Sequence, residues 1–249
     1  CDNFDSYVAG DFLCTQSDLW WTWDDNPGGD YDAYVVDDMA SSAPNSMGVD
    51  AAVIETDVVY DLGQTTTGVH KISLDFYVPD GGTYGGYFNV MQDMELFGAA
   101  NEWGFQIYFR SDGTGYFYDA DFTQTDFTYD IATWFNVTLV VDLDMAMADL
   151  WFDGVLVGAP WQWDIAGPNT LGAVDVYAAA DGNDDPMFYI DNFCYGPSDF
   201  DVGIDDPVSN TSIETAIFPN PATDHVTIEA NEIIDQILIY NNMGQLVYS

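Results

Sequence analysis

The chain has 249 residues, of which 43 are Asp or Glu and only two, Lys71 and Arg110, are Lys or Arg. The formal charge of −41 repels phosphate backbones and anionic headgroups, which excludes nucleic acid and anionic lipid as direct partners. Hydrophobic residues make up 48% of the chain and aromatic residues 16%, which predicts a packed core rather than a disordered acidic chain. No apolar run reaches the roughly 18 residues of a transmembrane helix, so we expect no direct membrane insertion.

Short apolar or alternating runs between Gly, Asp, Asn and Pro predict β-strands throughout residues 1–197. The expected strands are 3–7, 34–36, 46–49, 58–61, 70–78, 86–92, 103–109, 115–119, 134–142, 147–152, 155–161, 171–178 and 187–194. Asp153-Gly154, between two apolar runs, predicts a two-residue hairpin. With no capped helical pattern, the sequence indicates an all-β protein, an antiparallel sandwich of two sheets.

Residues 198–211 are acidic and poor in apolar residues, which is typical of a linker. A different pattern follows in residues 212–249. It opens with Phe-Pro-Asn-Pro, an extended and turn-forming segment because each Pro fixes its own φ. Alternating strands are expected at 225–229 and 237–240, and a turn at Met243-Gly244.

This tail resembles the type A C-terminal sorting domain of type IX (Por) secretion in the Bacteroidota. That family begins with Y/F-P-N-P-A/F-x-D and continues with an I-x-I-Y-x-x-x-G-Q strand and turn. The residues that match, and that form the expected sorting signal, are Phe218, Pro219, Asn220, Pro221, Asp224, Tyr240, Gly244 and Gln245. Family members usually continue for several more strands, so we expect residues 212–249 to be the N-terminal part of a small β-sandwich.

The resemblance implies a protein that is secreted or held at the cell surface after crossing the periplasm and outer membrane. Its implied partners are the type IX translocon and the outer-membrane shuttle components. The resemblance does not say what the exported domain does.

Three further segments, 2–7, 148–154 and 188–193, resemble the concanavalin A-like (laminin-G-like) jelly roll of secreted Bacteroidota proteins. In that fold the first and last strands are neighbours, which implies a disulfide from Cys194 to Cys1 or Cys14, with Cys1 preferred. A lipidated Cys1 is the alternative.

The same resemblance implies one structural calcium ion where the first and last strands meet. Asp191 would be one ligand, and Asp5 or Asp2 another, since Ca²⁺ prefers carboxylate and carbonyl oxygens. Asp191 could instead cap a strand edge or face solvent. A saline habitat would also explain the acidic surface, by screening its self-repulsion.

Glucanases on the concanavalin A-like fold use two Glu residues and an Asp on one strand face, in an E-x-D-x-x-E arrangement. Glu55, Glu95 and Glu102 form no such pattern, and Asp142 and Asp144 look like a solvated or cation-binding pair. We therefore expect no enzymatic activity, with a glycoside hydrolase or lyase as the less favoured alternative.

Tryptophan is concentrated in two places, at Trp20, Trp21 and Trp23 and at Trp161 and Trp163. In a strand Trp21 and Trp23 share one side and Trp20 faces the other, so one side can fill the core and the other can stack on a sugar ring. Tyr84, Tyr87, Tyr108, Tyr116 and Tyr118 could line the same sheet. Ordinary core packing is the competing interpretation of every one of these aromatics.

These observations predict a secreted or cell-surface β-sandwich module without enzymatic activity, which binds polysaccharide or serves adhesion. The alternatives are export cargo held by the type IX translocon and a self-assembling subunit of an extracellular structure.

Overall fold

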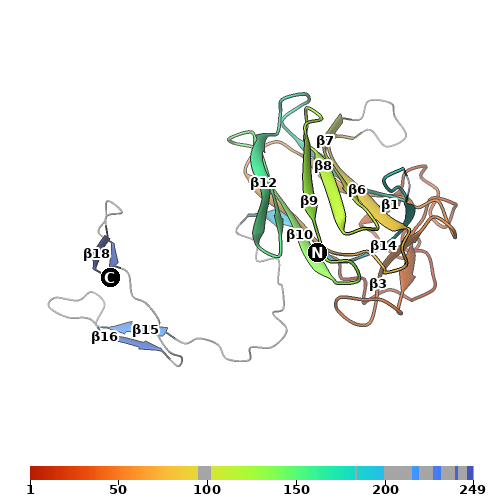
Figure 1. Cartoon of the computed structure of the whole chain (residues 1–249), viewed down its shortest axis with the longest axis horizontal. Coiled ribbons are helices and arrows are strands. Elements are labelled where there is room, and N and C mark those ends of the chain that lie inside the picture. Colours follow the sequence, from red (N-terminus) through yellow and green to blue (C-terminus); the bar gives the residue numbers. More distant parts are fainter. Residues whose placement is uncertain are drawn as a thin grey trace. The chain divides into compact units, whose positions relative to one another are not determined.

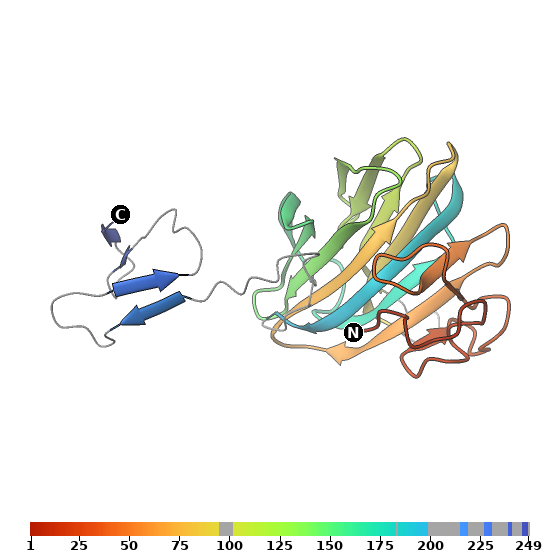
Figure 2. The ribbon, with the colours of Figure 1, turned by 90° about the horizontal axis from the view of Figure 1, so that it is seen from below.

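The computed structural model describes residues 1–94, 102–182 and 184–198, together with the backbones of four short strands between residues 215 and 248. The chain divides into two compact units, residues 1–202 and 203–249, and each is described by itself. Every regular element in the described residues is a β-strand (Figures 1 and 2). Accordingly, no described helix is long and apolar enough to cross a membrane.

The first sheet of unit 1 has the strand order β2-β3-β14-β5-β10-β11-β12. Its strands are β2 (Tyr34–Val36), β3 (Ser46–Asp50), β14 (Asp185–Pro197), β5 (Val69–Tyr77), β10 (Phe135–Asp142), β11 (Met147–Phe152) and β12 (Val155–Gln162). All neighbours in this sheet are antiparallel. The β11–β12 hairpin turns at Asp153 and Gly154, both with positive φ, as the sequence predicted.

The second sheet has the order β1-β4-β13-β6-β7-β8-β9. Its strands are β1 (Trp20–Thr22), β4 (Asp57–Thr65), β13 (Leu171–Tyr177), β6 (Tyr84–Asp93), β7 (Glu102–Phe109), β8 (Thr114–Tyr118) and β9 (Gln124–Thr128). These neighbours are also antiparallel. The start of β14 pairs in parallel with the start of β6, which links the two sheets.

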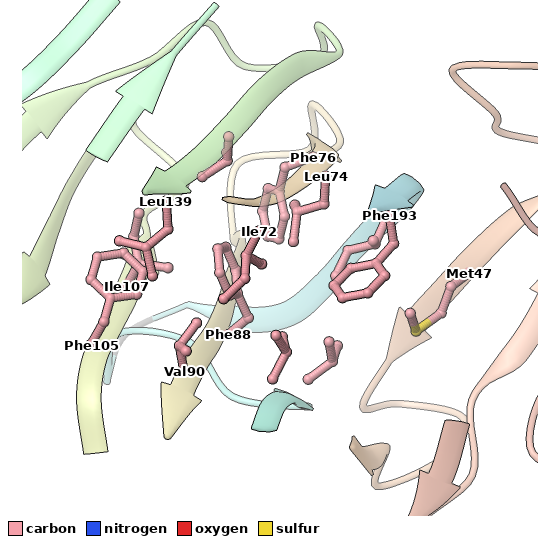
Figure 3. Packing of buried hydrophobic residues seen from close by; sticks show 14 of the residues in the cluster. Met47, Ile72, Leu74, Phe76, Phe88, Val90, Phe105, Ile107, Leu139 and Phe193 are labelled. Atoms are coloured by element: carbon pink, nitrogen blue, oxygen red, sulfur yellow. The ribbon is translucent and has the colours of Figure 1, made fainter. Parts of the chain in front are cut away.

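An aromatic core fills the space between the sheets. Phe76 of β5 stacks on Phe109 of β7, with ring centroids 4.3 Å apart, and on Phe188 of β14 at 5.0 Å. Figure 3 shows the side chains of β5 directed toward Phe88 of β6. Gly86 makes room for this packing, because a Cβ there would lie 2.7 Å from the Phe76 ring. The predicted all-β sandwich of two sheets is therefore confirmed.

Two parts of the strand prediction were wrong. Residues 3–7 form a turn instead of a strand: the Asp2 carboxylate accepts the N–H of Phe4, and Phe4 has a φ of 59°. Only Asp2 bridges to Phe193 of β14. Strands β1 and β9 were missed; the exposed and half-buried residues of β9 show no apolar alternation.

Cys1 and Cys194 are joined by a disulfide, the pairing preferred from the sequence, and Cys14 is a free, buried cysteine. The bond ties the start of the chain to β14, an interior strand of the first sheet.

In unit 2 the described strands form two antiparallel pairs. They are β15 (Thr215–Phe218) with β16 (Thr227–Ala230), and β17 (Ile239–Tyr240) with β18 (Leu246–Tyr248). Most of the predicted linker, 198–211, lies outside the described residues.

Candidate functional site

Three of the five tryptophans proposed to bind a ligand lie in the core. Trp20, Trp161 and Trp163 are 1%, 8% and 0% exposed, and Trp161 stacks on Phe105. Their rings are used for packing between the sheets, so their assignment to a binding surface was wrong. Trp21 has the expected alternation with Trp20, and Trp23 lies directly after β1. Trp21 is 42% exposed, and Trp23 lines a cavity.

The cavity lies on the outer face of the second sheet and has a volume of about 310 Å³. Its lining residues come from the strands β4, β13, β6 and β7 and from the segments next to them: Trp23, Asp57, Tyr87, Asn89, Met91, Trp103, Gln106, Tyr108, Asp175, Tyr177 and Ala179. We call this surface the outer cavity.

Strand register places the polar lining residues in rows across the sheet. Asp175 of β13 pairs with Asn89 of β6, and Asn89 pairs with Gln106 of β7. Because alternate residues share a face, Tyr87 lies on the same side as Asn89, and Tyr108 on the same side as Gln106. The polar groups of three strands therefore meet on one surface.

Aromatic side chains surround these polar groups. Trp103 is 41% exposed and Tyr177 is 43% exposed, and both line the cavity. Tyr87, Tyr108 and Tyr116 form a row across β6, β7 and β8, with successive ring centroids 4.6 and 4.9 Å apart.

The sequence also placed Tyr118 and Tyr84 on this surface. Tyr118 extends the row, 5.3 Å from Tyr116. Tyr84 was assigned to it wrongly, because it packs against the core and does not line the cavity.

Hydrogen bonds fix the polar residues at the base of the cavity. Asn89 Nδ2 donates to Asp175 Oδ2 at 2.6 Å and to the hydroxyl of Tyr87 at 3.1 Å. Tyr87 in turn donates to Gln106 Oε1 at 3.2 Å. Asn89 and Asp175 are only 1% and 8% exposed, so this network is held rigidly among buried neighbours.

A second carboxyl group, that of Asp57 on β4, also lines the cavity; Asp57 pairs with Tyr177, two residues along β13 from Asp175. Burial raises the pKa of Asp57 to about 6. The pKa of Asp175 is also raised well above its ordinary value, mainly by burial and secondly by the negative charge of Asp57. Burial and mutual repulsion disfavour two negative charges in one place, so the pair keeps one proton and carries one negative charge at moderately acidic pH.

The three proposed calcium ligands do not form a common site. Asp191 is fully buried; its Oδ2 accepts the N–H groups of Ser41 and Ser42, and its Oδ1 accepts that of Asn192. Asp2 Oδ2 accepts from Tyr7 and Trp20, and Asp5 Oδ1 accepts from Asn45. In the described part of the chain, no three His, Cys, Asp or Glu side chains are grouped so as to hold a metal ion.

These hydrogen bonds occupy oxygens that calcium would need, so Asp2, Asp5 and Asp191 do not fit the ion in this arrangement. Their role here is to pair buried or turn-forming N–H and O–H groups. Calcium binding by the protein remains a prediction.

Two residues of the expected sorting signal lie in described strands, Phe218 at the end of β15 and Tyr240 at the end of β17. The other six, Pro219, Asn220, Pro221, Asp224, Gly244 and Gln245, lie outside the described residues.

Comparison with protein families confirms the interpretation of the tail. Residues 216–249 match the family described as "Secretion system C-terminal sorting domain", and this stretch contains all eight residues of the expected signal. The protein is cargo of type IX secretion. It is exported to the cell surface or the extracellular space, and the secretion machinery handles it.

No curated protein matches the sequence. Among solved structures, "Cellulose induced protein, Cip1" is similar, with 14% identity and a TM-score of 0.52 over 78% of this chain and 95% of that one. A sialidase matches with 12% identity and a TM-score of 0.47 over 68% of this chain, which spans only 16% of the sialidase. Alginate lyase AlyC3 matches with 10% identity and a TM-score of 0.44, over 61% of this chain and 74% of that one. At these identities the similarity concerns the fold alone.

Sequence reasoning missed the base of the outer cavity. Asp57, Asn89 and Asp175 come from three strands far apart in the sequence and meet only through strand pairing. A signal was present: Val-Asp-Val at 174–176 and Phe-Asn-Val at 88–90 each place one polar residue inside an apolar strand. A buried polar residue needs a partner, so such an interruption marks a candidate site.

Proposed function

We propose that unit 1 is a carbohydrate-binding module without enzymatic activity, which the sorting tail delivers to the cell exterior. The outer cavity is the binding site. The observation that supports this proposal best is the combination of half-exposed rings, Trp103 and Tyr177, with buried hydrogen-bonding groups on Asn89 and Asp175. A sugar has the same duality, because its ring faces are apolar and its edges carry hydroxyl groups.

The carboxyl pair supports binding of a sugar. Asp57 and Asp175 both line the cavity, and a sugar hydroxyl can donate a hydrogen bond to either. Adhesion by the exported protein would follow directly, if the bound glycan belongs to a surface or matrix.

The test uses the full chain, a panel of soluble oligosaccharides, and two matched tryptophan variants. Trp103 lines the cavity, whereas Trp151 lies on β11 of the other sheet with its indole N–H donated to Asp149. We expect Trp103→Ala to weaken binding about 3- to 10-fold, since the stacking of an aromatic ring contributes about 0.5–1.5 kcal/mol. Trp151→Ala should bind normally.

Isothermal titration calorimetry measures both affinities, and size-exclusion chromatography in parallel records the oligomeric state. The proposal fails if no oligosaccharide binds, or if both variants bind as the unmodified protein does. Release of reducing sugar or of an unsaturated product would show an enzyme instead. Elution as a polymer would favour a structural subunit.

A further inference from the structure

The base of the outer cavity offers more acceptors than donors. Within the described residues, Asn89 Oδ1 accepts no hydrogen bond, although Asn89 is 1% exposed and lines the cavity. Asp175 Oδ1 also has no hydrogen-bond partner among the described residues. Buried polar atoms normally have partners, so these two indicate a ligand that donates hydrogen bonds.

The same position is negatively charged and has no compensating cation. None of the described residues that line the cavity is Lys, Arg or His. Lys71 lies on β5 of the first sheet, and Arg110 forms an ion pair with Asp181. The carboxyl pair therefore faces the cavity with its charge unpaired, and the chain's net charge of −41 attracts cations to it.

Rings suited to cation binding surround the pair. Trp23, Trp103, Tyr87, Tyr108 and Tyr177 line the cavity, and indole and phenol faces attract cations through their negative quadrupole. The row of tyrosines already binds one cation elsewhere on this face, because the Arg110 guanidinium carbon lies 4.7 Å from the Tyr116 ring centroid. Aromatic walls around a carboxylate favour an organic cation over a metal ion, which would need six or more oxygen ligands in the case of Ca²⁺.

From these observations we infer that the outer cavity selects glycans that contain amino sugars with free amines, and binds the ammonium group between Asp57, Asp175 and Asn89. This inference rests on the proposed carbohydrate-binding function and names its ligand class. The ammonium group donates the hydrogen bonds that Asn89 Oδ1 and Asp175 Oδ1 lack. The sugar ring lies against the half-exposed aromatic side chains.

Binding should displace the shared proton. The empty pair carries one proton and one negative charge, and a bound ammonium takes the place of that proton as the donor between the carboxylates. The proton leaves to buffer, so the pair becomes doubly negative and the ligand adds one positive charge. The titratable groups that face the pair are Tyr87 on β6, Tyr108 on β7, Tyr177 on β13 and Asp24 after β1. Burial raises the pKa values of Tyr87 and Tyr108, so both stay neutral during this exchange.

The experiment titrates the full chain with β-1,4-linked oligomers of glucosamine, N-acetylglucosamine and glucose, of equal length, in a slightly acidic buffer that keeps the amine protonated. We expect the glucosamine oligomer to bind about 30-fold more tightly than the other two, because loss of one partner from a buried charge pair has an effect of this size. Repeating the titration in buffers with different ionisation enthalpies should reveal release of a proton.

Two isosteric variants and one control locate the effect. Asp175→Asn should reduce the ratio of the affinities for the glucosamine and glucose oligomers to near one. If that variant folds poorly, Asp57→Asn provides the same test. Asp126→Asn removes the same charge from an exposed position on β9 of the same sheet, outside the cavity, and should keep the preference.

Equal affinity for the three oligomers would overturn this inference and leave the proposed function intact. Absence of binding to all three would overturn both. Tighter binding of oligolysine than of the glucosamine oligomer would overturn the assignment to amino sugars. Competitive displacement of the glucosamine oligomer by Ca²⁺ would show that the carboxyl pair holds a metal ion instead.

Discussion

The two outward faces of the sandwich use similar polar residues in opposite ways. On the first sheet, Asn136 Nδ2 donates to Ser73 and to Asp75, and Asp75 also accepts from Asn192. On the second sheet, Asn89 donates to Asp175 and Tyr87, but its own oxygen accepts nothing from the described residues. The first network is closed by the protein itself, and the second is left open.

This difference separates structural from functional polarity. A closed network stabilises the fold, because each buried group has a partner in the absence of any ligand. An open network lowers stability and persists where a ligand supplies the missing partners. The open network coincides with the outer cavity and its half-exposed rings, whereas the closed network joins β5, β10 and β14.

The largest expected effect comes from Asp191 on β14, which supports the closed network because its Oδ1 accepts the N–H of Asn192. Asp191→Ala leaves the partly buried N–H groups of Ser41, Ser42 and Asn192 without their acceptor on a fully buried residue, so the free energy of unfolding should fall by about 3 kcal/mol. Urea denaturation at neutral pH measures this change, and oligosaccharide affinity should be unaltered. The matched control is Asp126→Ala, an exposed position whose replacement should have almost no effect. A loss below about 1 kcal/mol at Asp191 would show that the face is not held by this network.

The open network should produce a smaller effect with an unusual dependence on pH. Carboxyl groups with a raised pKa bind protons more tightly in the folded state, so their contribution to stability is present near pH 4 and is lost as the pH rises through about 6. Asp57→Asn replaces one of these carboxyl groups by a neutral amide, so the variant loses less stability as the pH rises. The variant should therefore equal the unmodified protein near pH 4 and exceed it by about 2 kcal/mol at pH 7.

Thermal unfolding between pH 4 and pH 8 checks this prediction. Burial also raises the pKa of Asp191 to about 6, which adds the same trend to both proteins and cancels in their difference. Asp126→Asn corrects for the loss of one charge from a highly acidic chain. An Asp57→Asn variant that is less stable than the unmodified protein at pH 7 would contradict the pairing of the two carboxyl groups.

The sequence predicted those parts of the fold and of the candidate site that depend on neighbouring residues in the chain. The Asp153-Gly154 hairpin and the alternation in β10 depend on neighbouring residues, so the sequence revealed both. The sorting tail has a continuous pattern of residues and was recognised in the same way. In contrast, Asp57 and Asp175 meet through the register of β4 and β13, which no local pattern determines.

The tryptophans illustrate the same limit. Alternation correctly separated Trp20 from Trp21, but it could not say which side of β1 faces the core. Trp161 lies on an edge strand that is otherwise mostly exposed, yet its own ring is buried against Phe117 and Phe105. Trp103 was never singled out as a binding residue, although it is 41% exposed in the cavity, because it stands alone in its sequence segment.

The smallest expected effect is that of removing calcium on the stability of the protein. Asp191, Asp2 and Asp5 already accept hydrogen bonds from protein donors, so we expect a chelator to leave them unchanged. We expect the melting temperature of the full chain to change by less than about 2 °C when a calcium chelator is added, because the loss of even 1 kcal/mol would shift it by about 2–4 °C. Calcium added back in excess, at constant ionic strength, is the control for screening of the acidic surface. A drop of 5 °C or more that calcium reverses would show that an ion holds part of this face, and that the closed network is completed by a metal rather than by the protein alone.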